Sequence, residues 1–224
     1  MIYIIGTGPG DSKYVTLEAA GLIAASSVAY IPETDGEGRN VVEPLARKLG
    51  YAGDFKFYKV IMEDGFLLSA YKELALEFVR LSVEGKTVSY LTPGDHAFYS
   101  TSALLATCLD DISADYKIIA GIPSFTASSA LAKIPLVINR EKMLLGLMPK
   151  TLEELEKMAG STETVVLMKL AKQIDILLDY LEKHRPTHAF IIQKVGMPGE
   201  RVIDLLTEKL PGDAGNLSVA VIKK

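Results

Sequence analysis

The chain opens with MIYIIGTGPGD, residues 1–11. Residues 2–5 form a short apolar run that Gly6 stops, which is typical of a buried strand. Small and apolar residues then recur at helical spacing over residues 16–24, and Thr16 is of the type that caps a helix N-terminus. A buried strand, a glycine-rich loop and a helix in this order predict the first unit of an α/β domain.

The alternation continues through the first half of the chain. It predicts strands at 28–31, 55–61, 87–91 and 116–120, helices at 41–49, 67–83 and 100–109, and a further helix that Ser124 caps and that ends at residue 132. Strands that alternate with helices indicate a parallel sheet. Ligands of such sheets bind beyond the carboxyl ends of the strands. The glycine-rich loops of this sequence follow the strands, so we expect them at that edge.

After residue 135 the pattern of predicted strands and helices changes. Residues 151–154, Thr-Leu-Glu-Glu, have the pattern of a capping box that opens a helix. Beyond it the pattern predicts a strand at 164–168, a helix at 171–183, a strand at 188–194, a helix or strand at 202–209 and a strand at 217–222. We therefore expect two α/β domains, residues 1–120 and 121–224.

Composition excludes several function classes. The 224 residues include 24 basic and 28 acidic side chains, a net charge of −4, which does not suggest nucleic-acid binding. The apolar stretches are too short to span a membrane, and no basic segment precedes the first one, so we expect neither a transmembrane helix nor a signal peptide. Cys108 is the only cysteine, which excludes an intrachain disulfide and a cysteine metal cluster. We expect a cytoplasmic protein with no bound metal.

The Gly6-x-Gly8-x-Gly10 loop invites comparison with dinucleotide-binding loops. That fingerprint is G-x-G-x-x-G, with helix amides directed at a pyrophosphate. Here the third glycine comes one residue early, Pro9 removes an amide donor and Asp11 places a carboxylate where phosphate would lie. A nicotinamide-dependent oxidoreductase stays open as an alternative, as does a tight turn without a ligand.

Four further motifs follow in order. They are TPGDHAFYST at 92–101, GIPSF at 121–125, VLMKL at 166–170 and KVG at 194–196. Together with GTGPGD at 6–11 and VTLEA at 15–19, they resemble the tetrapyrrole (corrin/porphyrin) methylases, which use S-adenosylmethionine. Each motif alone is weak, but five in the right order are specific, and the resemblance covers nearly the whole chain.

Within that family the sequence looks most similar to the precorrin-2 and cobalt-precorrin-2 C20-methyltransferases. The runs that carry this resemblance are Phe-Tyr-Ser-Thr at 98–101, Pro-Ser-Phe at 123–125 and Leu-Met-Lys-Leu at 167–170. One departure is His96, which replaces the proline that usually follows Gly-Asp in the second loop.

The resemblance implies two α/β domains with the cofactor in the cleft between them, a tetrapyrrole substrate and a homodimer. The positions that it assigns to S-adenosylmethionine are Pro9, Pro93, Gly94, Asp95, Phe98, Ser124, Phe125, Met168 and Gly196. The loop that contains Gly8, Gly10 and Asp11 should floor the substrate trough. The substrate carries carboxylates, for which the candidate partners are Arg39, Arg140, Lys142 and Lys169.

The methyl transfer requires alignment of its two reactants more than it requires reactive side chains. A sulfonium methyl is already electrophilic and C20 of a reduced tetrapyrrole is nucleophilic, so the enzyme mainly has to align them and exclude water. A proton must then leave C20, and His96 is a candidate base by position and type. The open alternatives are a methylase of another corrin position, a diphthine-synthase-like enzyme that modifies a peptide, and a binding module. Whether the substrate carries cobalt does not follow from the sequence.

Overall fold

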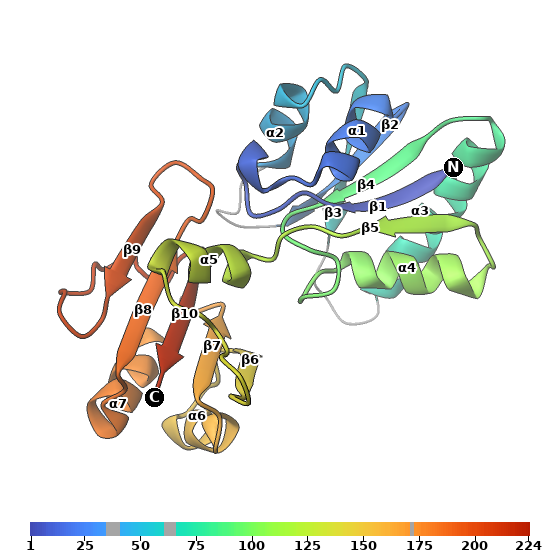
Figure 1. Cartoon of the computed structure of the whole chain (residues 1–224). Helices are drawn as coiled ribbons and strands as arrows, with labels where there is room; N and C mark the ends of the chain where they lie inside the picture. Colours follow the sequence, from blue (N-terminus) through green and yellow to red (C-terminus); the bar gives the residue numbers. More distant parts are fainter. Residues whose placement is uncertain (35–40, 61–65, 171–172) are drawn as a thin grey trace. The chain divides into compact units, whose positions relative to one another are not determined.

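The computed structural model describes residues 1–34, 41–60, 66–170 and 173–224, and these divide into two compact units, Met1–Pro123 and Ser124–Lys224 (Figure 1). The division lies three residues beyond the boundary expected after residue 120. It falls between strand β5, Tyr116–Ile119, and helix α5, Ser124–Ala132.

The first unit is a five-stranded parallel sheet in the order β3-β2-β4-β1-β5. Besides β5, its strands are β1 (Ile2–Gly6), β2 (Val28–Thr34), β3 (Asp54–Val60) and β4 (Val88–Thr92). Its helices are α1 (Leu17–Ala25), α2 (Val42–Lys48), α3 (Phe66–Val83) and α4 (Ser102–Asp111), and a 3₁₀ turn, η1, spans Ser12–Tyr14. The parallel sheet and its alternating helices confirm the α/β prediction for this half.

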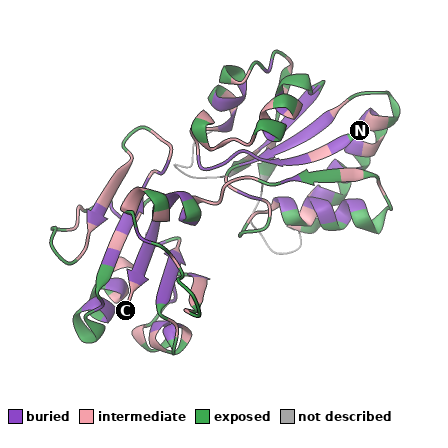
Figure 2. Cartoon of the chain, in the orientation of Figure 1, coloured by how far each residue is buried: buried purple, intermediate pink, exposed green. Residues whose placement is uncertain are grey.

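Two helix layers cover this sheet (Figure 1). Ile2 and Ile4 face a core built with α3 and α4, whereas Ile5 faces a core built with α1 and α2. Successive side chains of a strand point to opposite faces, so a strand covered on both faces is buried along its whole length. The strand β4 shows this, because all five of its residues are buried (Figure 2), among them the polar Ser89 and Thr92.

The second unit has a mixed five-stranded sheet in the order β6-β7-β10-β8-β9. Its strands are β6 (Met143–Leu147), β7 (Thr164–Met168), β8 (His188–Gln193), β9 (Arg201–Asp204) and β10 (Ser218–Lys223). The strand β10 runs antiparallel to β7 and β8. Helices α6 (Leu152–Ala159) and α7 (Ile174–His184) share a core with one face of the sheet, and α5 packs on β8 and β10. Both units are thus α/β, as expected.

The two helix caps expected from the sequence, at Thr16 and Thr151, are both present in the structure. Thr16 accepts the Ala19 N–H at 3.2 Å and so caps α1. Thr151 accepts the Glu154 N–H, but the Glu154 carboxylate accepts the N–H of Lys150 at 3.0 Å and not that of Thr151, so the capping box closes one residue further out.

One expectation about the second half is corrected. The segment 202–209, open as helix or strand from its sequence, is strand only to Asp204 and continues as a turn. His184 ends α7 and His188 begins β8, and both are exposed.

None of the helices in the described part of the chain is both long and apolar enough to cross a membrane.

Candidate functional site

Three loops of the first unit leave the same edge of its sheet. The strands β4, β1 and β5 are neighbours and parallel, with Gly6 opposite Thr92 and Ile5 opposite Ile119. Their carboxyl ends therefore lie together, and so do the loops that follow: residues 7–11, 93–101 and 120–123. This is the edge at which ligands of open α/β sheets bind.

The first two loops are joined by reciprocal backbone hydrogen bonds between two glycines. The Gly94 N–H donates to the Gly8 carbonyl at 2.8 Å, and the Gly8 N–H donates to the Gly94 carbonyl at 3.1 Å. Thr7 also donates two hydrogen bonds to the Thr92 carbonyl, from its N–H at 2.9 Å and from its hydroxyl at 3.1 Å. Gly8 and Gly94 have φ of +70° and +71°, a backbone conformation in which glycine avoids the strain of a side chain.

Gly6, Gly94 and Gly121 bring the three loops into direct contact. A β-carbon placed on Gly6 would lie 2.6 Å from the Gly121 nitrogen and 2.9 Å from the Gly94 carbonyl oxygen. One placed on Gly121 would overlap that same oxygen. Gly94 is different, because a β-carbon there would meet nothing within 4 Å. Two of the glycines thus permit contact between the loops, whereas Gly94 presents an open backbone face.

The Asp95 carboxylate links the second and third loops through two hydrogen bonds, which we call the Asp95 bracket. Its Oδ1 accepts the Ala97 N–H at 2.8 Å and its Oδ2 accepts the Gly121 N–H at 2.7 Å. The residue is buried, with 9% of its surface exposed. Both carboxylate oxygens are therefore used in holding backbone amides. The structure gives Asp95 a loop-forming role that the sequence did not suggest.

The rest of the second loop is open to solvent. Pro93 is exposed, and Phe98 and Tyr99 retain 38% and 48% of their surface. Tyr99 takes a φ of +52°, which is uncommon for a bulky residue and fixes the turn before α4. An open backbone at Gly94, flanked by an exposed proline and an exposed aromatic ring, suits the close approach of a flat, partly apolar ligand.

His96 is half-buried and is held by a run of hydroxyl groups. Its Nδ1 lies 3.1 Å from Oγ of Ser102, which lies 2.7 Å from Oγ of Ser100, which in turn lies 2.9 Å from Oγ1 of Thr92. Ser102 is fully buried at the first turn of α4. We call Thr92, Ser100 and Ser102 the hydroxyl chain. The sequence singled out His96 but not this chain, whose only signal is the clustering of hydroxyl residues at 100–102.

A second polar group lies on the core side of this loop. The Tyr71 hydroxyl bonds the Tyr90 hydroxyl at 2.9 Å and donates to Oγ1 of Thr101 at 2.9 Å. Burial raises the pKa of both tyrosines, so they act as neutral hydrogen-bonding groups. They anchor the start of α4 to the sheet.

The first loop ends in a capped turn. Asp11 accepts the Lys13 N–H at 3.0 Å and so caps η1. That backbone N–H holds the pKa of the Asp11 carboxyl below its ordinary value of 3.8. Pro9 and Gly8 are buried, whereas Gly10 and Asp11 are partly exposed. Of the four positions, the last two are the accessible ones.

In the second unit, Met168 and Gly196 lie at one edge of the sheet. Met168 ends β7 opposite Val219, and Gln193 ends β8 opposite Ser218, so both strand ends flank the start of β10. Lys169 is exposed at a φ of +58°, and the Gly196 N–H donates to the Glu200 carboxylate at 2.7 Å. Ser124 begins α5, where the sequence had suggested a cap, and Phe125 is buried.

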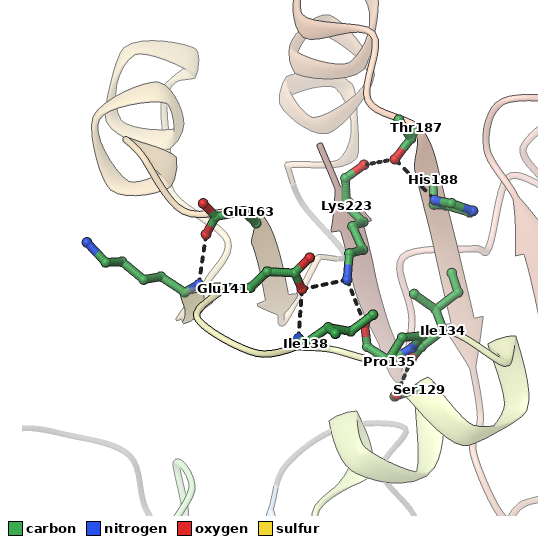
Figure 3. A network of polar contacts seen from close by, with 10 residues as sticks. Ser129, Ile134, Pro135, Ile138, Glu141, Glu163, Thr187, His188 and Lys223 are labelled. Atoms are coloured by element: carbon green, nitrogen blue, oxygen red, sulfur yellow. Dashed lines mark hydrogen bonds and ion pairs between the residues drawn. The ribbon is translucent and has the colours of Figure 1, made fainter.

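The candidate Arg140 lies in a segment that is fastened to β10. The Lys223 Nζ reaches Oε2 of Glu141 at 2.8 Å and the Pro135 carbonyl at 3.3 Å, while Glu141 also accepts the Ile138 N–H (Figure 3). Arg140 itself is exposed, as is Lys142. Arg39, the remaining candidate, lies outside the described residues.

Comparison with known proteins identifies the family. The family model of the Tetrapyrrole (Corrin/Porphyrin) Methylases matches residues 1–211. The chain belongs to this family. As a tetrapyrrole methylase it is a methyltransferase that uses S-adenosylmethionine.

Individual relatives of this methylase differ in the carbon that their names specify. The chain is 26% identical to a probable cobalt-precorrin-2 C(20)-methyltransferase of Methanocaldococcus jannaschii, over 100% of this chain and 96% of that protein. It is 27% identical to a precorrin-4 C(11)-methyltransferase of Rhodococcus erythropolis, over 90% of this chain and 80% of that protein.

The methylase fold is also seen in solved structures. A uroporphyrin-III C-methyltransferase of Thermus thermophilus, crystallised with S-adenosylhomocysteine, superimposes with a TM-score of 0.70 at 17% identity, covering 100% of this chain and 97% of that one. The two-domain tetrapyrrole methylase fold expected from the motifs is therefore confirmed.

Proposed function

We propose that this methylase transfers a methyl group to C20 of precorrin-2 or cobalt-precorrin-2 in cobalamin biosynthesis. The observation that carries the proposal is the whole-length similarity to the Methanocaldococcus C(20)-methyltransferase. The runs at 98–101 and 123–125 support it, because they resemble the C20 branch more than its relatives.

We propose that Pro93, Gly94 and Phe98 hold S-adenosylmethionine in the first unit, largely through backbone groups. The open face of Gly94 and the exposed side chains beside it fit a ligand that lies close to the backbone. Asp95 contributes by fixing the loop. Pro9, Ser124, Phe125, Met168 and Gly196 complete the proposed set, on the family resemblance alone.

The bound cofactor supplies a methyl group on an electrophilic sulfonium. The chain's own contribution is orientation, since the reaction needs carbon, methyl and sulfur in line. Two features make the loops at the β4 edge rigid. They are the close contact of Gly6, Gly94 and Gly121 and the Asp95 bracket. The exposed cation at Lys169, next to Met168, would bind a substrate carboxylate, whereas Arg140 precedes β6 at the opposite end of this sheet. The loop at Gly8, Gly10 and Asp11 would form the floor of the trough. The homodimer and the cytoplasmic location remain part of the proposal.

A second candidate is methylation at C11 of a later intermediate, which the 27% identity to the Rhodococcus enzyme favours. The test incubates the protein with labelled S-adenosylmethionine and precorrin-2, with and without inserted cobalt, and locates the new methyl by NMR. A methyl at C20 supports the proposal, and a preference for one form tells whether cobalt is already in the substrate. No transfer to either form, or a methyl at another carbon, contradicts it.

Cofactor binding is tested separately by titration calorimetry. S-adenosylhomocysteine should bind and NAD should not. Binding of NAD alone would instead support the oxidoreductase alternative for the Gly6–Gly10 loop.

A further inference from the structure

We propose that Ser102 is a positioning residue that fixes His96 with its Nδ1 protonated, so that Nε2 accepts the proton released from C20. This inference rests on the proposed C20 methylation. It concerns a buried serine in the first turn of α4 and a half-buried ring in the loop after β4.

His96 contacts the hydroxyl chain through one ring nitrogen. Its Nδ1 lies 3.1 Å from Ser102 Oγ. The neighbouring carboxylate of Asp95 accepts one backbone N–H on each oxygen. Because Nδ1 is engaged by the hydroxyl chain, we assign proton uptake to the other ring nitrogen, Nε2.

The hydrogen bonds of the hydroxyl chain can point in either of two directions. A hydroxyl group has one proton to donate. When Nδ1 donates to Ser102, Ser102 can donate to Ser100 and Ser100 to Thr92, and Ser100 still accepts the Ser102 backbone N–H at 3.2 Å. The opposite direction, from Thr92 towards the ring, satisfies the same contacts but requires a bare Nδ1.

Only one of the two directions is compatible with His96 Nε2 as the base. Methylation leaves C20 with both the new methyl and its original hydrogen. The C20–H bond then breaks, its electron pair returns to the conjugated macrocycle and the proton goes to Nε2 of His96. The ring now carries a proton on each nitrogen, so Nδ1 must donate. Only the direction from the ring towards Thr92 fits that state, and a chain already set this way needs no rearrangement during proton transfer.

The first experiment needs no variant. The protein contains three histidines, so ¹⁵N-labelled imidazole spectra are simple to assign, with His96→Gln identifying the resonance of interest. In the neutral ring we expect a protonated Nδ1 and a bare Nε2. Ser102→Ala should shift the ring towards the Nε2–H tautomer that free imidazole prefers. A wild-type His96 in the Nε2–H form would overturn the proposal.

The second experiment uses substrate deuterated at C20. For Ser102→Ala we expect kcat to fall about tenfold and the primary deuterium isotope effect on kcat to rise, with KM nearly unchanged, because general-base catalysis typically contributes 10²- to 10⁴-fold and only part depends on positioning. Ser102→Thr, which keeps the hydroxyl, should restore the isotope effect. Ser89→Ala is the matched control, since Ser89 is equally buried but bonds Ser26 at 2.6 Å.

The outcomes separate this inference from the proposed function. A new methyl that NMR locates at another carbon, with deuterium retained at C20, defeats the C20 proposal itself. Deuterium retained beside a methyl at C20 defeats the proton-transfer step and so the role of His96 and Ser102. Loss of deuterium with a methyl at C20, but with the kcat and isotope effect of His96→Gln and Ser102→Ala equal to wild type, defeats only the role of these two residues.

Discussion

The carbonyl oxygen of Gly94 lies so close to Gly121 that a β-carbon on Gly121 would overlap it. The same β-carbon would approach the Gly6 carbonyl carbon and Cα at 2.8 and 2.9 Å, and all of these neighbours are backbone atoms that cannot rotate away. The contact between loops from three strands thus requires glycine at Gly121, as it does at Gly6.

Gly121→Ala should therefore destabilise the fold and weaken cofactor binding together. Overpacking typically costs about 1–3 kcal/mol, and backbone neighbours place this case at the upper end. Urea unfolding and calorimetry with S-adenosylhomocysteine measure the two effects. Gly212→Ala is the matched control, because a β-carbon there meets nothing within 4 Å. Equal stability of the two variants would contradict the contact.

Gly94→Ala should weaken cofactor binding in addition to lowering the stability of the fold. Its β-carbon enters open space, but the φ of +71° costs about 1–2 kcal/mol for any residue with a side chain. Gly85→Ala carries the same strain at a φ of +83°, also in open space, in the turn between α3 and β4. We expect both to lose similar stability and only Gly94→Ala to lose affinity for S-adenosylhomocysteine, by about tenfold or more. Similar affinities would place the cofactor elsewhere.

Asp95→Asn should loosen the bracket between the second and third loops. An amide has one acceptor oxygen, so one of the Ala97 and Gly121 N–H groups would face an NH₂ group instead. A buried donor without an acceptor costs about 1–3 kcal/mol. Hydrogen exchange at the Gly121 amide should accelerate together with the loss of stability. An unchanged exchange rate would show that the bracket is dispensable.

The order of elements was predictable because both units obey local rules. The strand 164–168 was predicted with the bounds that the structure has, and so was the end of α5 at residue 132. The strand β1 was recognisable because residues 2–5 are a continuous apolar run that Gly6 ends. The turn after Asp204 was not predicted, because residues 205–210 keep an apolar spacing that also suits a helix.

The site was predictable as a set of loops but not as a set of contacts. The order of the glycine motifs placed the loops after strands, and parallel pairing brought them to one edge. The bonds from Asp95 to Gly121 and from His96 to Ser102 depend on loop conformations that no local pattern encodes. The resemblance assigned Asp95 to the cofactor site, and its carboxylate holds backbone amides.

The Glu141–Lys223 ion pair should make stability depend on pH. Lys223 holds the pKa of the Glu141 carboxyl below its ordinary value of 4.5, helped by the Ile138 N–H. A pKa that is lower in the folded state stabilises the protein above pH 4.5, and this contribution is lost as the pH falls through the folded-state value. Glu141→Gln should thus be less stable than wild type at pH 7, with the gap closing below pH 4.5 in urea unfolding. Glu182→Gln, an exposed change on α7, should show no such convergence.

Removal of the exposed cation at Lys169 should raise KM for the tetrapyrrole and leave kcat nearly unchanged. The substrate carboxylates do not react, so contacts to them persist from the ground state to the transition state and contribute uniform binding. The Lys169 side chain is exposed, and a solvent-exposed ion pair contributes at most about 1 kcal/mol, so Lys169→Gln should raise KM by up to about fivefold. Because salt screens exposed charges, the difference from wild type should shrink at high ionic strength. Lys209→Gln, which removes another exposed charge beyond β9, controls for the change in net charge. A fall in kcat at constant KM would mean that Lys169 does not act by holding a carboxylate.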